Sequence, residues 1–538
     1  MRNHIVALLL GSAMTLAIPA VAQDRVPDNR TVLPIYKPAY PYGADAAVAG
    51  RDAAASVTSL DEAFALAYWT NPTLLAQRAS LKSVDALYPG ARAAYGPQVT
   101  LQGRHGYAWD RVETTPNNWI GQRGFSSTAT LIFNQPIVSF GRRSAAEGSA
   151  LAQIALGRSQ LRLSEAQTML DVVTDYITVI RDREALTIAQ DNLGLLERQY
   201  NDSEARFRVR EITSTDLQQV QTRVEFGRAQ VLNAQGQLGI SQSRFLQDVG
   251  GIAGQLASPA PLQIGVATLE DAYATAEINS PLVRAAQARE KISRAELAAA
   301  RAEQLPDVTW QNSGAYGPLT DYQNSLRTTE VRSSVVVTLP LIDSGIRRSR
   351  IEQVKQANDA DWRLIDQALR DTQQAVAGAW DAYRSALLSL DHYREASAAA
   401  QKAFDGAVVQ EKAGARTTLD VLDLARDLLN VRTNYVTAQA NEYVARANLV
   451  AAMGNLEAPL LVPSIRGYDP RENFDRQKGR GDVPLLTPVL SGLDSVFTGD
   501  LKSDRVVRDP AGQLRTQSSV TGTAVPPAPP VPKPANKR

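Results

Sequence analysis

The sequence predicts a membrane α/β protein made of two similar halves, each of which supplies one β-hairpin of membrane-spanning length and one very long helical hairpin. Three observations predict this fold class. The chain contains an internal duplication, it begins with a secretion signal that no later apolar helix follows, and its strand-like and helical segments recur in the same order. We expect several copies of the chain to build one barrel together.

The duplication is visible as pairs of motifs at a nearly constant distance. Asn71-Pro72 recurs as Ser280-Pro281, and the strand-like segment after Pro97 recurs after Pro306, in both cases 209 positions later. Gly141-Arg142-Arg143 recurs 204 positions later, within Gly345-Ile346-Arg347-Arg348. A period of roughly 200 residues is too long for a solenoid of small repeats, so it indicates two similar halves of one architecture.

Residues 1–22 have the pattern of a secretory signal: a short polar start, an apolar run over 5–18, and Ala20-Val21-Ala22 before a cleavage site. The chain has no cysteine, which excludes disulfides, thiolate chemistry and a lipid anchor of the bacterial lipoprotein kind. After the signal, no apolar run approaches the roughly 18 residues of a membrane-spanning helix. We therefore expect an exported protein that no helical anchor holds.

The charge balance argues against nucleic acid as a partner. The formal net charge is +1, from 57 basic and 56 acidic side chains, so no positive excess attracts a polyanion. The three histidines, His4, His105 and His392, are isolated, and the sequence therefore has no metal-ligand spacing and no catalytic dyad. We predict a protein that is not an enzyme and uses no cofactor.

The first elements of each half are predicted helices. Apolar residues from Leu60 to Ala67 recur with helical spacing behind Ser59, which is a typical N-cap. Thr268 precedes the same pattern in the second half, where helix is expected to continue to Glu303.

Strand-like segments follow these helices at 98–109 and 126–135 in the first half, and at 307–316 and 332–339 in the second. Each pair predicts a hairpin with a loop of about 15 residues and strands of about ten residues, the length that crosses a bilayer as part of a barrel. Four strands cannot close a barrel. Because open edges in lipid leave backbone groups unpaired at several kcal/mol each, we predict that oligomerisation is obligatory.

Residues 141–250 and 345–454 are predicted long helical segments, interrupted near their middles at 208–215 and 412–418. A helix from 141 to 207 would be on the order of 100 Å long, which no compact domain needs. Tyr176 and Trp380 hold equivalent positions in the two halves, and we expect both to pack between helices rather than to bind a ligand.

The two interruptions predict turns at the far ends of helical hairpins. Thr213 and Thr417 are placed to cap the returning helices, with Asp216 and Asp420 three residues further on. Gly414 supplies backbone freedom in the second turn.

These elements divide the chain into five predicted parts. They are a signal peptide (1–22), an extended N-terminal leader (23–57), a first repeat of helix, β-hairpin and long helical hairpin (58–257), a second such repeat (258–460), and a Pro-rich, largely disordered C-terminal tail (461–538).

The ordered, duplicated set of motifs resembles the TolC family of outer-membrane channels over residues 58–460. The likeness is carried by Leu60-Asp61-Glu62-Ala63, Asn71-Pro72-Thr73-Leu74, the strand after Pro97, the turn from Pro136 to Gly141 and the Thr-x-x-Asp helix tips. The resemblance implies a homotrimer in the lipid of the bacterial outer membrane, in which each chain gives four strands to one twelve-stranded barrel. A long α-helical barrel continues it into the periplasm. The implied partners are a periplasmic adaptor (membrane fusion) protein and an inner-membrane ABC or proton-driven transporter.

The first tip, from Glu204 to Asp216, looks most like the branch of the family that serves type I protein secretion. Arg210 departs from that branch, which usually has glycine at this position.

The second tip is similar to the family segment that closes the periplasmic entrance. The paired aspartates of that segment match Asp420 and Asp423, and an arginine at the position of Arg416 belongs to the polar links that hold the entrance shut. Side chains at i and i+3 share one helix face, so three chains would place six carboxylates around a narrow axis, where they attract cations and repel anions. The alternative is that both aspartates are ordinary charges near a helix start, on a solvated face. The first copy has Gln219 at the position of Asp423, so only the second copy carries the pair.

The function implied by the resemblance is an outer-membrane channel-tunnel that forms the exit duct of a tripartite export system, in the first instance for type I protein secretion. A multidrug or small-molecule efflux duct of the same family is the first alternative. A periplasmic coiled-coil structural or adaptor protein is the second, and it would require the four strands to form soluble hairpins.

Overall fold

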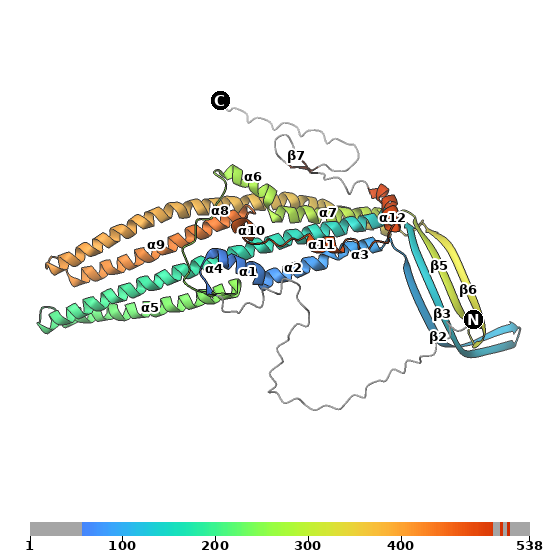
Figure 1. Ribbon diagram of the computed structural model, residues 1–538, viewed down its shortest axis with the longest axis horizontal. Coiled ribbons are helices and arrows are strands. Elements are labelled where there is room, and N and C mark those ends of the chain that lie inside the picture. Colours follow the sequence, from blue (N-terminus) through green and yellow to red (C-terminus); the bar gives the residue numbers. More distant parts are fainter. Residues whose placement is uncertain (1–55, 499–505, 509–513, 517–538) are drawn as a thin grey trace, which may run out of the picture. The chain divides into compact units, whose positions relative to one another are not determined.

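The computed structural model describes residues 56–498, 506–508 and 514–516 (Figure 1). The predicted signal peptide, 1–22, lies outside the described residues, and so does the leader, 23–57, except for Ser56 and Val57. No helix in the described part of the chain is both long enough and apolar enough to cross a membrane.

Each repeat opens with helices whose N-caps include the two that the sequence predicts, Ser59 and Thr268. Ser59 and Glu62 form a reciprocal capping box at the start of α1, Asn71 accepts two backbone N–H groups at the start of α2, and Thr268 caps α6. The first repeat contains α1 (Leu60–Thr70), α2 (Pro72–Asp85) and α3 (Leu87–Ala93), and the second contains α6 (Leu269–Asn279) and α7 (Pro281–Ala302).

The four predicted strands form one antiparallel sheet in the order β2-β3-β5-β6 (Figure 1). They are β2 (Gln98–Thr115), β3 (Asn118–Val138), β5 (Asp307–Thr320) and β6 (Gln323–Thr338). The prediction of loops of about 15 residues, made from the run of polar residues between the apolar segments, is wrong. Both strands of each hairpin stay paired through that polar run, because backbone hydrogen bonds between strands do not depend on apolar side chains. Asn117 completes the first tight turn with a φ of 67°, a conformation in which asparagine is enriched.

The register gives the sheet one apolar and one polar face. Val99 and Leu101 of β2 are paired with Phe133 and Leu131 of β3, and because successive side chains of a strand point to opposite faces, these four share a face. The pairing places further exposed apolar residues on that face, namely Tyr107, Trp109, Phe125, Trp310, Tyr316, Val331, Val335 and Val337. The opposite face is mainly polar and includes Gln102, Arg104, Thr128, Thr130, Gln311 and Ser334.

The long helical hairpins agree with the prediction. They consist of α4 (Arg142–Arg208) with α5 (Ser214–Val249), and of α8 (Ile346–Lys412) with α9 (Thr418–Ala452). Helices α4 and α8 have 67 residues each, which is about 100 Å of helix. They begin at Gly141 and Gly345, whose φ values of 97° and 88° are accessible to glycine without a steric penalty. Helix α4 packs against α5, α7 and α9, so α9 links the two helical hairpins.

The largest apolar core lies where α1, the middle of α4 and the C-terminal parts of α5 and α9 meet. Tyr176 is fully buried there and donates a hydrogen bond to the carbonyl oxygen of Ala257 at 2.7 Å. Trp380 packs against the same core. Both aromatic residues are therefore packing residues, as predicted. A short parallel ladder of β1 (Ser56–Val57) with β4 (Ile252–Ala253), and α10 (Ala458–Leu461), complete this region.

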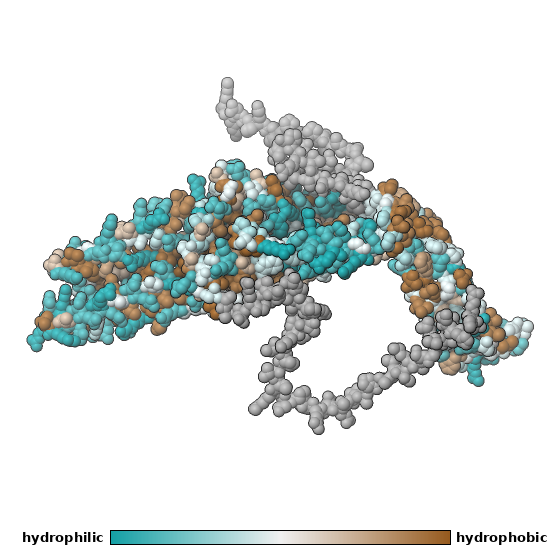
Figure 2. Space-filling model, viewed as in Figure 1, coloured by the Kyte–Doolittle hydropathy of each residue, from teal (hydrophilic) through white to brown (hydrophobic). Residues whose placement is uncertain are grey.

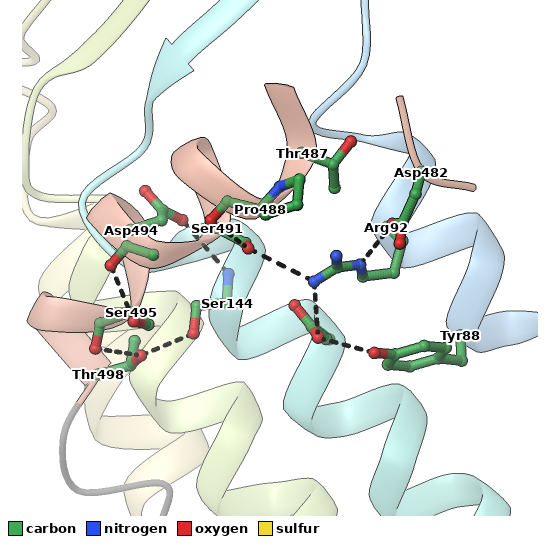
Figure 3. A network of polar contacts seen from close by, with 12 residues as sticks. Tyr88, Arg92, Ser144, Asp482, Thr487, Pro488, Ser491, Asp494, Ser495 and Thr498 are labelled. Carbon is green, nitrogen blue, oxygen red and sulfur yellow. Dashed lines mark hydrogen bonds and ion pairs between the residues drawn. The ribbon is translucent and has the colours of Figure 1, made fainter. Parts of the chain in front are cut away.

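The prediction of a largely disordered tail over 461–538 is wrong for 461–498. This segment contains α11 (Glu472–Gln477) and α12 (Leu486–Ser495), and further on β7 (Val506–Arg508) pairs with β8 (Leu514–Thr516). Its fold depends on partners in the first repeat (Figure 3): Arg92 donates to Asp482 at 2.7 Å, and Ser139 donates through its backbone N–H to Asp494 at 2.8 Å. The composition of this segment indicated disorder, because composition contains no information about contacts with residues more than 300 positions away.

Candidate functional site

The turns at the ends of the two helical hairpins have nearly the same local structure. Thr213 caps α5 and Thr417 caps α9, each as a capping box that Asp216 or Asp420 completes. In the second turn, Thr417 Oγ1 donates to Asp420 Oδ2 at 2.9 Å and accepts the backbone N–H of Asp420 at 3.2 Å. These contacts confirm the predicted caps.

The backbone of the two turns is also equivalent. Gly414, singled out in the sequence for its freedom, has a φ of 72°, and Arg210, the residue 204 positions earlier, has a φ of 63°. The first copy therefore places a bulky side chain in the left-handed region, where residues other than glycine are strained.

The carboxylate of Asp420 is engaged in hydrogen bonds with the N-cap residue of α9, Thr417. Hydrogen bonds from the hydroxyl and then the backbone N–H of Thr417 hold the pKa of Asp420 below its usual value, and the nearby Arg416 guanidinium acts in the same direction. Asp216 repeats this pattern with Thr213, whose hydroxyl lowers its pKa. Asp420 is therefore an anion at neutral pH, and its local role is that of a first-turn acid.

Asp423 has a partner in the other repeat. Its Oδ1 accepts a hydrogen bond from Nη2 of Arg223 on α5 at 3.2 Å, and the side chains of Arg223 and Asp423 are 34% and 47% exposed. The structure thus separates the two predicted gate carboxylates: Asp420 holds its own helix start, whereas Asp423 connects the two helical hairpins.

A second connection between the hairpins lies deeper, at Glu411 near the end of α8. This side chain is buried, and its Oε1 accepts from Nε2 of Gln199 on α4 at 2.9 Å and from Oγ1 of Thr418 on α9 at 2.8 Å. Arg206 on α4 approaches the same carboxylate at 3.7 Å. One buried carboxylate therefore joins both hairpins to the first residue of α9.

Apolar contacts support the start of α9 on two sides. Val421 belongs to a cluster with Phe404 and Ala407 of α8, whereas Leu422 belongs to a cluster with Leu196 of α4 and Val220 of α5. A cavity of about 460 Å³ lies between the tips, and its lining includes Arg206, Asp216, Gln219, Arg416, Thr417 and Leu422. Arg416 and Asp216, which the sequence places at the tips of different repeats, thus line the same cavity.

The sequence interpretation missed Arg223 and Glu411. Both break the repeat, since their equivalents 204 positions away are Asp427 and Phe207. A comparison of the two copies for residues that change charge between them would have identified these positions.

The site consists of caps, ion pairs and apolar contacts between two helical hairpins. In the described part of the chain, no group of three or more His, Cys, Asp or Glu residues is placed to hold a metal ion.

Comparison with known proteins identifies the family. A family model described as outer membrane efflux protein matches residues 65–251 and 272–455, one segment in each repeat. BepC of Brucella suis, an outer membrane efflux protein, is 25% identical over 427 residues, which cover 79% of this chain and 92% of BepC. TolC of Escherichia coli is 22% identical over 418 residues, which cover 72% of this chain and 82% of TolC.

Solved structures show the same fold. The CmeC outer membrane channel of Campylobacter jejuni superposes with a TM-score of 0.65 at 13% identity, over 79% of this chain and 90% of CmeC. The resemblance to the TolC family is thereby confirmed, as is the predicted location in the outer membrane with a periplasmic extension. The chain belongs to the outer membrane efflux protein family.

Proposed function

We propose that three copies of this chain form a passive exit duct, in which four strands from each copy close one twelve-stranded barrel and the long helices continue it as a periplasmic tunnel. The observation that carries the proposal is the sheet itself. It has one apolar and one polar face, which is the pattern of a barrel wall between lipid and an aqueous lumen.

The strand order supports closure between chains. Among the strands that the structure describes, β2 and β6 are the edges of the four-stranded sheet. An edge left open in lipid costs several kcal/mol for each unpaired backbone group. Pairing of β6 of one chain with β2 of the next removes both edges, and the family to which the chain belongs supports three as the number of copies.

The tips are proposed to be the periplasmic gate. Asp420 and Asp423 lie at the start of α9, and three chains would gather six such carboxylates around the axis, where they favour cations. The links from Asp423 to Arg223 and from Glu411 to Gln199 would hold the hairpins together in the closed state. Arg416, in the cavity between the tips, would add a further polar link. Opening would require these contacts to break while the capped turns stay intact.

The energy for opening has to come from partners, because a duct of this kind performs no chemical step. A periplasmic adaptor and an inner-membrane ABC or proton-driven transporter are the proposed partners. They would engage the helical hairpins and bring the cargo.

Two cargo classes have support. The likeness of residues 204–216 to the type I secretion branch favours an unfolded secreted polypeptide. The name of BepC, an efflux protein that this chain matches over 92% of its length, favours small molecules. Deletion of the gene, followed by comparison of the secreted proteome and of drug sensitivity, separates the two classes. Loss of one secreted protein with unchanged drug sensitivity would support polypeptide secretion, and the reverse result would support efflux.

The duct itself is tested by extraction and conductance. We expect the protein to leave membranes only in detergent, to migrate as a heat-labile trimer, and to conduct ions in planar bilayers. A monomer that is soluble without detergent would overturn the proposal and favour a periplasmic coiled-coil structural or adaptor protein.

A further inference from the structure

Helix α12, near the end of the described chain, exposes a stripe of large apolar side chains. Val489, Leu493 and Val496 are 60%, 50% and 75% exposed, and their spacing of four and three residues places them on one helical face. The opposite side of the helix is buried through Thr487, Leu490 and Asp494. An apolar stripe of this length on the outside of a short helix requires a partner.

The structure fixes α12 at the junction between the sheet and the long helices. Asp494 accepts the backbone N–H and the hydroxyl of Ser139, at 2.8 and 2.7 Å, and the backbone N–H of Ser144 at 3.3 Å. Ser139 follows β3 and Ser144 lies in the first turn of α4. The hydroxyls of Thr498 and Ser144 are 2.7 Å apart (Figure 3).

A second anchor holds the middle of α12 and the segment that precedes it. Arg92 of α3 donates to Ser491 at 3.4 Å and to Asp482 at 2.7 Å (Figure 3). Contacts at the C-terminal end of α12, at its middle and just before it therefore determine its orientation, and the apolar stripe faces away from the chain because of them.

The outer face of α12 has no charge. Its single charged residue, Asp494, points inward to the junction. Helix α11, in the same C-terminal segment, differs: Glu472, Asp475 and Arg476 are all exposed and form surface ion pairs. Helix α11 thus has the charged surface of a water-exposed helix, whereas the outer face of α12 does not.

The apolar stripe lies beside the apolar face of the sheet. Figure 2 shows apolar surface over α12 and along the adjoining strands. The ends of the strands next to the long helices contribute Val99, Leu101, Val335 and Val337 to this face. At the corresponding junction of the second repeat, Leu341 and Ile342 are also exposed.

We propose that α12 is an interfacial helix whose apolar stripe lies in the lipid of the periplasmic leaflet of the outer membrane. An uncharged outer face and a position at the ends of the strands fit a helix that lies in the membrane surface. The membrane accounts for the exposed apolar residues at both junctions. The inference rests on the proposed function, because it takes the apolar face of the sheet to face lipid.

The absence of cysteine from the chain allows a direct test with single nitroxide labels on the full-length protein in lipid vesicles. Val489→Cys reports on the stripe, Arg476→Cys on the water-exposed helix α11, and Leu101→Cys on the apolar face of the sheet. For each label, electron paramagnetic resonance measures the accessibility to oxygen, which concentrates in lipid, and to a water-soluble nickel chelate. We expect the labels at 489 and 101 to gain oxygen accessibility and lose chelate accessibility relative to the label at 476.

The three labels separate failure of the inference from failure of the proposed function. A label at 489 that behaves like the one at 476, while the label at 101 is in lipid, overturns the inference and leaves the barrel intact. A label at 489 that neither reagent reaches places protein on the stripe, from a neighbouring copy or from residues beyond 498, and also overturns it. A water-accessible label at 101 contradicts the barrel itself.

Discussion

Arg223 on α5 and Asp423 on α9 form the hydrogen-bonded ion pair that joins the tip of the first repeat to the tip of the second, with 3.2 Å between Nη2 and Oδ1. The pair connects two helices that begin at separate turns of the chain. The equivalent positions in the opposite copies hold Asp427 and Gln219, so the pair has no counterpart with the two repeats exchanged.

The first prediction concerns this pair. Arg223→Ala removes the link and keeps the carboxylate, so single-channel conductance should rise while cation preference is retained. A half-exposed ion pair contributes about 0.5–1 kcal/mol, so three pairs would shift the balance between closed and open tips by about 2 kcal/mol, or roughly 30-fold. Arg228→Ala is the matched control, because Arg228 on the same helix pairs with Glu225 and Glu197 within its own hairpin. Equal conductance of both variants and the wild type would show that the pair does not restrain the tips.

The second prediction separates the capping role of Asp420 from its proposed role in the gate. Asp420→Asn removes the charge and keeps an oxygen that accepts hydrogen bonds at the cap, whereas Thr417→Ala removes the cap at a cost of about 1 kcal/mol. We expect Asp420→Asn to reduce cation preference in planar bilayers. Thr417→Ala should mainly increase hydrogen exchange in the first turn of α9. If Asp420→Asn leaves ion selectivity unchanged, Asp420 serves the helix start alone.

The sequence predicts this region well where structure is local and poorly where it is not. The caps at Thr213 and Thr417 depend on residues three positions apart, and they form as expected. The partners of Asp423 and Glu411 depend on how two hairpins pack, and no local pattern contains that information. Helix α12 was missed for the same reason, since Asp494 has its partners at Ser139 and Ser144.

The strands show a second limit of prediction from the sequence. Their existence, order along the chain and apolar pattern were predictable, but their ends were not. The polar residues between the apolar segments suggested loops, whereas the register continues from Gln98↔Asn134 to Thr115↔Asn118. Cross-strand pairing beyond the apolar segments is a property of two strands together, and a single strand does not encode it.

The third prediction uses the two tip turns as controls for each other. Arg210 and Gly414 both have positive φ, 63° and 72°, and a left-handed conformation costs a residue other than glycine roughly 1–2 kcal/mol. Arg210→Gly should therefore stabilise the first turn by about 1 kcal/mol. The greater conformational entropy of glycine in the unfolded chain reduces this gain.

Gly414→Ala should destabilise the second turn by a similar amount. A Cβ atom at Gly414 meets no other atom within 4 Å, so the variant measures backbone strain without a clash. Hydrogen exchange of the amides near each turn gives both changes in free energy. Opposite signs are expected, and a destabilised Arg210→Gly variant would mean that the arginine side chain makes a contact that outweighs its strain.

The fourth prediction is a pH dependence that comes from Glu165 on α4. This carboxylate is buried and lies 3.8 Å from the Arg78 guanidinium, which packs against the rings of Tyr68 and Tyr468 at 4.4 and 4.9 Å from their centroids. Burial raises the pKa of Glu165 from 4.5 to about 7, and the charge of Arg78 offsets only part of that effect.

The sign follows from proton uptake. Between pH 4.5 and about pH 7 the folded protein holds a proton on Glu165 that the unfolded chain has released. The free energy of unfolding therefore falls as pH rises through this window. Burial raises the pKa of Asp175 to about 7 as well, so that residue contributes a slope of the same sign. Glu165→Gln should flatten the slope in part and stabilise the protein above pH 7, by up to about 3 kcal/mol.

Urea unfolding of the detergent-solubilised protein at several pH values between 5 and 8 measures the slope. Glu197→Gln is a suitable control, because Glu197 lies on the same helix but is about half exposed. We expect the control to keep the wild-type slope. A Glu165→Gln variant that is less stable than the wild type above pH 7 would show that the ionised carboxylate is required next to Arg78. In that case the attraction between the two charges outweighs the burial of Glu165.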